Sequence, residues 1–183
     1  MSRILVAFHT SEGQTARIAE RIAEVLRQDG DDVDVSELDH APAPDAYDGI
    51  AVGDSIHIGH HSRPMTHYLK EYAGQLGGVT SALFQVSMTS AYTDDEHSTL
   101  AHTKVQELLD HTGFVPDIVG LFAGALVYTK YGWLTRRVMR SIEGHQGGDT
   151  DTTRDYEYTD WDAVEHFAHD IHALVAAAAA ESG

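Results

Sequence analysis

A chain of 183 residues with 42% hydrophobic residues is long enough to bury one core and too short for two, so we expect a single domain over residues 1–183. The formal net charge of -17 predicts a surface that repels nucleic acid, and an acidic, lysine-poor surface is what a halophilic protein is expected to carry. The absence of cysteine excludes disulfides, thiolate zinc sites, iron–sulfur clusters and cysteine nucleophiles.

The first expected strand is the apolar run at residues 4–8, and an amphipathic helix follows it, with Ile18, Ile22, Val25 and Leu26 at helical spacing. This periodicity argues against intrinsic disorder, which is the other interpretation of a high net charge. The strand begins so early that we expect no signal peptide, and no apolar run approaches the ~20 residues of a membrane span. We therefore expect a cytoplasmic protein.

A hydroxyl-rich loop joins this strand to the helix. The N-terminus of a helix directs backbone N–H groups and the positive end of the helix dipole at one spot, where an anion such as phosphate is stabilised. An ordinary helix cap is the alternative, because Ser and Thr are common there. The predicted phosphate loop consists of Thr10, Ser11, Glu12, Gly13, Gln14 and Thr15.

Strands and helices alternate along the rest of the chain. We expect strands at 33–35, 47–53, 81–88 and 115–126. One helix should open at Arg63-Pro64, a second should cover about 95–111 and present Leu100, Val105, Leu108 and Leu109, and a third should end with the alanine run at 176–180. Pro116, Gly120 and Gly124 predict that the last strand bends or splits. This alternation is typical of a parallel sheet covered by helices on both faces.

Three loops follow the expected strand ends, at residues 10–15, 55–61 and 87–92. The carboxyl ends of parallel strands meet at one edge of a sheet, and ligands bind there at the point where the strand order reverses. We therefore expect the three loops to form one binding site.

These loops resemble those of the flavodoxins. The loop at 10–15 is similar to the flavodoxin loop that binds the FMN phosphate, and the two later loops are similar to the pair that encloses the isoalloxazine ring. The resemblance implies FMN as cofactor and a flavodoxin-like three-layer α/β/α sandwich, with a five-stranded parallel sheet in the order 2-1-3-4-5. The ring-contacting residues that it implies are Ser55, Ile56, His57, Ile58, Gly59, Ser87, Met88, Thr89, Ser90, Ala91 and Tyr92.

Further segments resemble the menaquinone-dependent protoporphyrinogen IX dehydrogenases, which are flavodoxin-like enzymes. They are residues 53–60, 123–128 and 147–152 (Gly-Gly-Asp-Thr-Asp-Thr), followed by Tyr-Thr-Asp-Trp at 158–161. The resemblance covers nearly the whole chain and implies an insertion at about 127–158, near the last strand. In that family six electrons pass from protoporphyrinogen IX through FMN to a quinone, so the resemblance implies a role in heme biosynthesis with menaquinone as acceptor.

The insertion holds four of the chain's 12 basic residues between positions 128 and 140, together with aromatic and apolar residues. A basic amphipathic helix could lie on the inner face of the cell membrane, or basic side chains could pair with the propionates of the substrate. The same residues could instead pack on the sheet with solvated arginines, or form a contact in a homo-oligomer. The candidate substrate-binding residues are Tyr128, Lys130, Tyr131, Arg136 and Arg137.

The thirteen histidines do not predict a metal site. His57, His60 and His61 are close in sequence, but no nearby carboxylate completes an obvious ligand set. His57 could contact the ring edge or relay a proton, or could simply be solvated. No residue stands out as a catalytic acid or base.

Three functions fit these observations: an FMN-dependent protoporphyrinogen IX dehydrogenase, a flavodoxin-type electron carrier without porphyrinogen activity, and a flavin-free interaction module. The fold alone does not choose between them.

Overall fold

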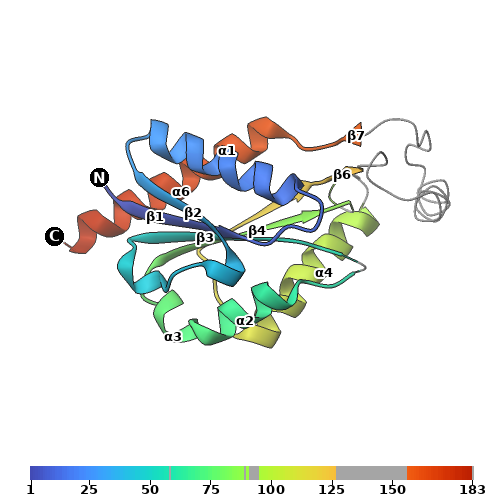
Figure 1. The fold of residues 1–183 in the computed structure, drawn as a ribbon, viewed down its shortest axis with the longest axis horizontal. Coiled ribbons are helices and arrows are strands. Elements are labelled where there is room, and N and C mark those ends of the chain that lie inside the picture. The colour runs from blue at the N-terminus through green and yellow to red at the C-terminus, as the bar shows by residue number, and fades with distance from the viewer. Residues whose placement is uncertain (58, 89, 91–94, 127–155, 183) are drawn as a thin grey trace.

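The computed structural model describes residues 1–57, 59–88, 90, 95–126 and 156–182. Five parallel strands form a central sheet with helices on both faces, which makes a three-layer α/β/α sandwich (Figure 1). The strand order is β2-β1-β3-β4-β5, so the expected flavodoxin-like order is confirmed. The strands are β1 (Arg3–Phe8), β2 (Asp32–Glu37), β3 (Gly49–Ser55), β4 (Thr80–Ser87) and β5 (Ile118–Ala123).

Helices α1 and α6 cover one face of the sheet, and α2, α3 and α4 cover the other (Figure 1). Short 3-10 turns at Leu38–His40 and Pro44–Ala46 connect β2 to β3. The helices are α1 (Gln14–Gln28), α2 (Arg63–Glu71), α3 (Ala73–Leu76), α4 (Asp95–Thr112) and α6 (Trp161–Ser182). None of the helices in the described part of the chain is long and apolar enough to cross a membrane.

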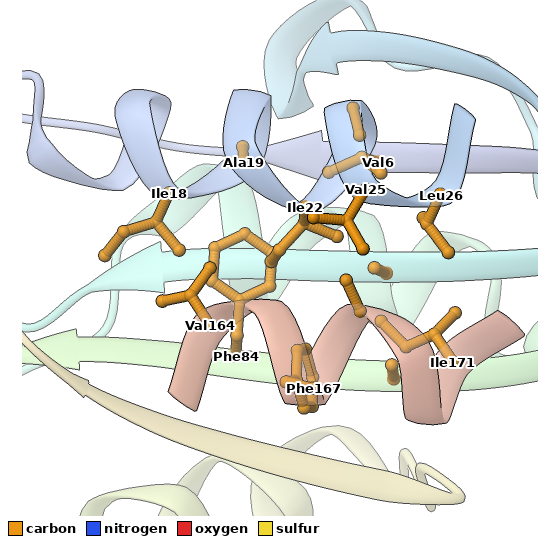
Figure 2. Packing of buried hydrophobic residues seen from close by; sticks show 14 of the residues in the cluster. Val6, Ile18, Ala19, Ile22, Val25, Leu26, Phe84, Val164, Phe167 and Ile171 are labelled. Atoms are coloured by element: carbon orange, nitrogen blue, oxygen red, sulfur yellow. The ribbon is translucent and has the colours of Figure 1, made fainter. Parts of the chain in front are cut away.

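The ring of Phe84 lies at the centre of the core between the sheet and helices α1 and α6 (Figure 2). It is fully buried, and the rings of Phe167 and Phe122 lie 6.5 Å from it, centroid to centroid. The apolar stripe of α1 packs beside it, as its helical spacing predicted. On the neighbouring strand, a Cβ added to Gly53 would overlap the Phe84 ring, so this packing requires glycine at position 53.

The opposite core layer lies between the sheet and helices α2, α3 and α4. Ala101, Val105 and Leu108 form the buried stripe of α4. Leu100, which we expected on the same face, is 44% exposed, because it precedes this stripe by one residue and is rotated by about 100° around the helix.

The last strand region divides, as the glycines predicted. β5 ends at Ala123, and after Gly124 the chain forms β6 (Ala125–Leu126), which pairs antiparallel with β7 (Tyr156–Glu157). The N–H of Gly124 donates to Ser87 O (3.2 Å), and its carbonyl accepts from Tyr158 N (3.2 Å). Gly124 is therefore the point where the central sheet ends and the small β6–β7 ladder begins.

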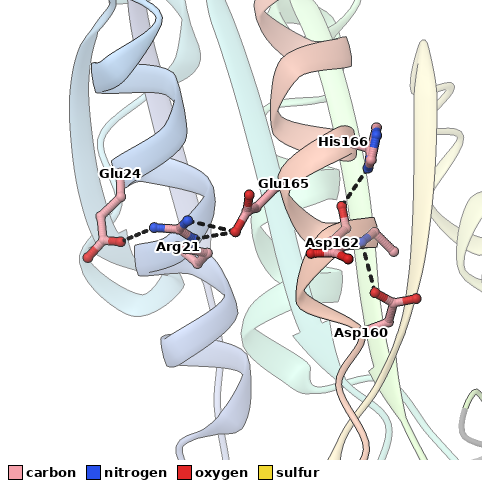
Figure 3. Close-up of polar contacts among 7 residues, drawn as sticks. Arg21, Glu24, Asp160, Asp162, Glu165 and His166 are labelled. Carbon is pink, nitrogen blue, oxygen red and sulfur yellow. Dashed lines mark hydrogen bonds and ion pairs between the residues drawn. The ribbon is translucent and has the colours of Figure 1, made fainter.

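Polar contacts hold α1 to α6 on the outer surface (Figure 3). Arg21 contacts Glu165 through Nη2 (2.6 Å) and Glu24 through Nη1 (2.8 Å). Asp160 caps the N-terminus of α6, because its Oδ1 accepts a hydrogen bond from the backbone N–H of Ala163 (3.1 Å). These contacts fix the position of the first turns of α6 relative to α1.

Candidate functional site

The ends of β1, β3 and β4 lie side by side at one edge of the sheet, because these strands are adjacent and parallel. Backbone bonds continue the ladders into the loops: His9 N donates to Gly53 O and Ile56 N donates to Val86 O, both at 2.9 Å. β6, β7 and the first turn of α1 lie at the same end of the molecule (Figure 1). The described parts of the three loops that we expected to meet therefore start from one edge of the sheet.

The loop between β1 and α1 has the geometry of an anion site. Gly13 is left-handed (φ +101°), and its N–H donates to the hydroxyl oxygen of Thr10 (2.9 Å), which leaves the Thr10 hydroxyl hydrogen available to a ligand. The N-cap residue of α1 is Gly13, which has no side chain to cap the helix, and the first turn of α1 contains no acidic residue. The N–H groups of the first turn of α1 and the positive end of the helix dipole therefore favour an anion at this end of the helix.

The first residues of α1, Gln14 and Thr15, are only 8% and 1% exposed. The side-chain amide of Gln14 donates to Glu157 Oε1 (3.0 Å) and Thr159 Oγ1 (2.8 Å) and accepts from Arg17 Nη1 (3.0 Å). With its side chain engaged in this way, Gln14 has its backbone N–H left for a phosphate, and its part in phosphate binding stays a prediction.

The contacts of Gln14 belong to a cluster that joins α1 to β7 and the residues just after it. We call it the Gln14 cluster (Gln14, Arg17, Glu157 and Thr159). Arg17 forms an ion pair with Glu157 (3.0 Å), and its guanidinium lies 5.3 Å from the centroid of the Trp161 ring. The Thr159 hydroxyl donates to Ala123 O (2.7 Å) at the end of β5. The Tyr-Thr-Asp-Trp motif therefore connects the phosphate loop, the sheet edge and α6.

Burial of Glu157 raises its pKa, but hydrogen bonds from Gln14 and Arg17 outweigh burial and hold the pKa below its ordinary value of 4.5. Such a carboxyl contributes stability that is complete above its unfolded-state pKa and is lost as the pH falls through its folded-state pKa. We expect Glu157→Gln to lower the melting temperature near neutral pH, with a difference from the parent that narrows below pH 4.5.

Thermal unfolding across the acid range measures this, and Glu20→Gln, at an exposed position of α1, is the matched control. A melting-temperature difference that stays constant or widens in acid would contradict the ionic role of Glu157.

The loop after β3 is a tight hairpin. His57 and His60 exchange backbone hydrogen bonds (3.1 and 3.2 Å), and Gly59 adopts a left-handed conformation (φ +75°). The side chains of both histidines are exposed, whereas the Ser55 hydroxyl oxygen is buried and has no hydrogen-bond partner among the described residues. An unpartnered hydroxyl at this place suits a ligand with polar ring atoms.

The loop after β4 begins with a turn in which the Ser87 and Ser90 hydroxyls lie 2.8 Å apart and Ser90 N donates to Ser87 Oγ (3.3 Å). Met88 is half-buried in this turn.

Several predicted site residues lie outside the described part of the chain, and their roles stay predictions: Ile58, Thr89, Ala91, Tyr92, Tyr128, Lys130, Tyr131, Arg136 and Arg137. The expected insertion at 127–158 also lies there, apart from its last three residues.

A family model described as "Flavodoxin domain" matches residues 5–153. The chain belongs to the flavodoxin family. Its fold is similar to the solved structure of a flavodoxin from the domain Archaea, with a TM-score of 0.55, 17% identity, and coverage of 95% of this chain and 99% of the other.

Relatives that carry the name protoporphyrinogen IX dehydrogenase [quinone] match most of this chain. The one from Leishmania major is 33% identical over 176 residues, which cover 94% of this chain and 75% of the relative. The one from Escherichia coli K12 is 31% identical over 171 residues, which cover 92% of this chain and 94% of the relative. The similarity therefore extends over nearly the whole of this flavodoxin-family chain.

FMN is the cofactor that membership of the flavodoxin family indicates. The site fits it, since the uncapped α1 N-terminus suits a phosphate and the buried, unpartnered Ser55 hydroxyl lies at the next loop, where the ring is expected. Among the described residues, no group of His, Asp and Glu side chains is arranged to hold a metal ion.

Two features of the site were not found from the sequence. The Gln14 cluster joins residues more than 140 positions apart, and no local pattern marks such a contact. Asp54 and His61 form a buried pair at 3.1 Å below the β3 loop. An acidic residue inside an otherwise apolar strand was the available signal for this pair, because a buried carboxylate needs partners.

Proposed function

We propose that this flavodoxin-family chain is an FMN-dependent dehydrogenase that oxidises protoporphyrinogen IX to protoporphyrin IX and passes the electrons to menaquinone, in heme biosynthesis. The observation that carries the proposal is the 31% identity to the Escherichia coli protein of that name over 94% of its length. The proposed flavin site at the sheet edge is consistent with a redox function, because a helix N-terminus suited to the phosphate and a loop suited to the ring lie there.

When bound, FMN accepts electrons from the substrate and hands them to the quinone, and the protein supplies binding and orientation. In this proposal the α1 N-terminus and the Thr10 hydroxyl hold the phosphate, and this anchors one end of the cofactor. The hairpin of His57 and His60 presents backbone and side chains at the other end. The proposal gives the chain the role of positioning the cofactor and assigns no protein acid or base.

The basic residues between 128 and 140 are proposed to bind the substrate propionates. We expect Lys130→Glu or Arg136→Glu to raise the KM for protoporphyrinogen IX about tenfold, since each replaces an attractive charge with a repulsive one, while FMN affinity is unchanged. Steady-state kinetics beside an FMN titration measure both. Unchanged kinetics in both variants would show that these residues do not bind the substrate, and would favour the alternative that the segment packs on the sheet with solvated basic side chains.

Peripheral contact with a membrane is also proposed for this basic segment, since quinones dissolve in bilayers. Co-sedimentation of the protein with anionic lipid vesicles tests it. Absence from the vesicle pellet at low salt would rule the contact out.

The test of the proposed function is an assay of protoporphyrin formation with FMN and a menaquinone analogue at high salt, where an acidic surface is screened. We expect porphyrin fluorescence to rise in proportion to the FMN-loaded protein. Bound FMN without turnover would leave an electron carrier, and absence of flavin binding would leave an interaction module.

A further inference from the structure

Asp54 places a fully buried carboxylate near the end of β3. Its Oδ2 accepts from the backbone N–H of Ser62 (2.7 Å) and lies 3.1 Å from Nδ1 of His61, whose side chain is only 7% exposed. Asp54 and Ser62 thus lie together at the two ends of the β3 loop, and His61 contacts Asp54 from within it.

The Asp54–His61 pair has more polar atoms than partners. Asp54 Oδ1 and His61 Nε2 are buried without a hydrogen-bond partner among the described residues, and so is Oε1 of Gln85. Gln85 is the register partner of Asp54 on β4, and its Nε2 donates to Ala101 O in α4 (3.1 Å). Three unpartnered polar atoms therefore lie on or beside two neighbouring strands.

Such a pair is poorly explained as a source of stability. Burying a carboxyl group and an imidazole carries a large desolvation cost, and well-packed apolar side chains of similar volume often stabilise a protein as well or better. Each buried polar atom without a partner adds a further penalty. Because the pair is expected to lower the free energy of unfolding, a role in the adjoining site accounts for it better than a role in stabilising the core.

The residues that the pair encloses are those expected to meet the flavin ring, Ser55 to Gly59. Inside this loop His57 and His60 already exchange two backbone hydrogen bonds, so the hairpin itself is fixed. What the Asp54 contacts add is the attachment of the hairpin to the end of β3 and to the start of α2. Without them the bond from Ile56 N to Val86 O would still hold the start of the loop to β4, but the hairpin beyond it could pivot relative to the phosphate loop.

We propose that Asp54 and His61 are positioning residues that hold the β3 loop in the conformation that binds the isoalloxazine ring. The proposal rests on FMN binding at this edge and is independent of which substrate is oxidised. It separates two parts of cofactor affinity, because the pair contacts neither Thr10 nor the start of α1 in the described structure. Loss of the pair should weaken binding of the ring and leave the contribution of the phosphate intact.

Titration of the apo-protein with riboflavin and with FMN, followed by flavin fluorescence, tests this. For His61→Leu we expect both affinities to fall roughly tenfold, with their ratio unchanged. His61→Asn can keep a donor near the position of Nδ1, so it should restore both affinities to within about threefold of the parent. His67→Leu, at an exposed histidine of α2, is the matched control and should bind as the parent does.

A second variant separates binding from folding. Asp54→Asn combined with His61→Leu removes the charge while keeping an acceptor for Ser62 N, so the apo-protein should melt at or above the parent temperature and still show the loss of riboflavin affinity. Riboflavin binding equal to the parent in either variant, or a fall in apo-protein melting temperature in both, would overturn the proposal. If the parent itself binds neither flavin, the cofactor assignment fails with it; porphyrinogen turnover does not enter this test.

Discussion

Ser11→Glu is expected to lower the affinity for FMN about 100-fold and to leave the affinity for riboflavin within about threefold of the parent. Ser11 is exposed in the loop before α1, next to the uncapped helix N-terminus. A carboxylate at this position would stand beside the FMN phosphate, where each pair of like charges contributes about 1–4 kcal/mol of repulsion. Riboflavin lacks the phosphate, so it reports the ring contacts alone.

Gln28→Glu is the control for this substitution, because it adds the same charge at the far end of α1. Over 15 residues the helix separates the two positions by about 20 Å, which is beyond the Debye length at ordinary salt. Isothermal titration at low and high salt gives both affinities, and the effect of Ser11→Glu should shrink as salt rises. An equal loss for FMN and riboflavin would show that the phosphate does not bind at this loop.

Gly53→Ala is expected to destabilise the fold by about 2–3 kcal/mol, because a buried core accommodates an added methyl group only by moving its neighbours. The new Cβ would overlap the Phe84 ring, which is fully buried against Phe122 and Phe167. For a chain of this length the melting temperature should fall by about 4–12 °C. Flavin affinity should also weaken, since Gly53 O accepts the hydrogen bond from His9 N at the base of the phosphate loop.

Gly74→Ala, in α3, supplies the contrasting substitution. A Cβ there would meet no atom within 4 Å, so alanine should be neutral or slightly stabilising.

Phe84→Leu should partly rescue Gly53→Ala, because the smaller side chain vacates the overlapping volume, and a double-mutant cycle measures this coupling. Purely additive effects would contradict the contact on which the prediction rests.

Most of the fold could be predicted from local patterns, because the apolar runs, the helical spacing of apolar residues and the position of Gly124 are clear in the sequence. The apolar run of β1 is buried throughout, the stripe of α1 packs on the sheet, and Gly124 divides the last strand where its backbone was expected to bend. The parallel direction of the strands follows from the alternation of strands and helices, whereas the strand order was implied by the resemblance to the flavodoxins. The expected position of Leu100 was wrong because a helical face can be misassigned by one residue when several leucines lie close together.

The site was only partly predictable from the sequence, for a physical reason. The phosphate loop has a local signature, since its glycine and hydroxyls act within six residues of one another. The contacts of Gln14 with Glu157 and Thr159, and of Asp54 with His61, depend on how separate segments pack, and a sequence window carries no record of that packing. Asp54 is buried because β4 and α2 pack against β3, and these segments are separate in the sequence.

The most direct measurement of the proposed function is a single turnover without oxygen. The FMN-loaded protein is mixed with protoporphyrinogen IX, and the flavin and porphyrin spectra are followed together. We predict that the visible flavin absorbance is lost in the same phase in which oxidised porphyrinogen products appear, and that adding a menaquinone analogue restores it. A flavin that stays oxidised in the presence of substrate, although it can be reduced chemically, would contradict the assignment of this chain as a protoporphyrinogen IX dehydrogenase.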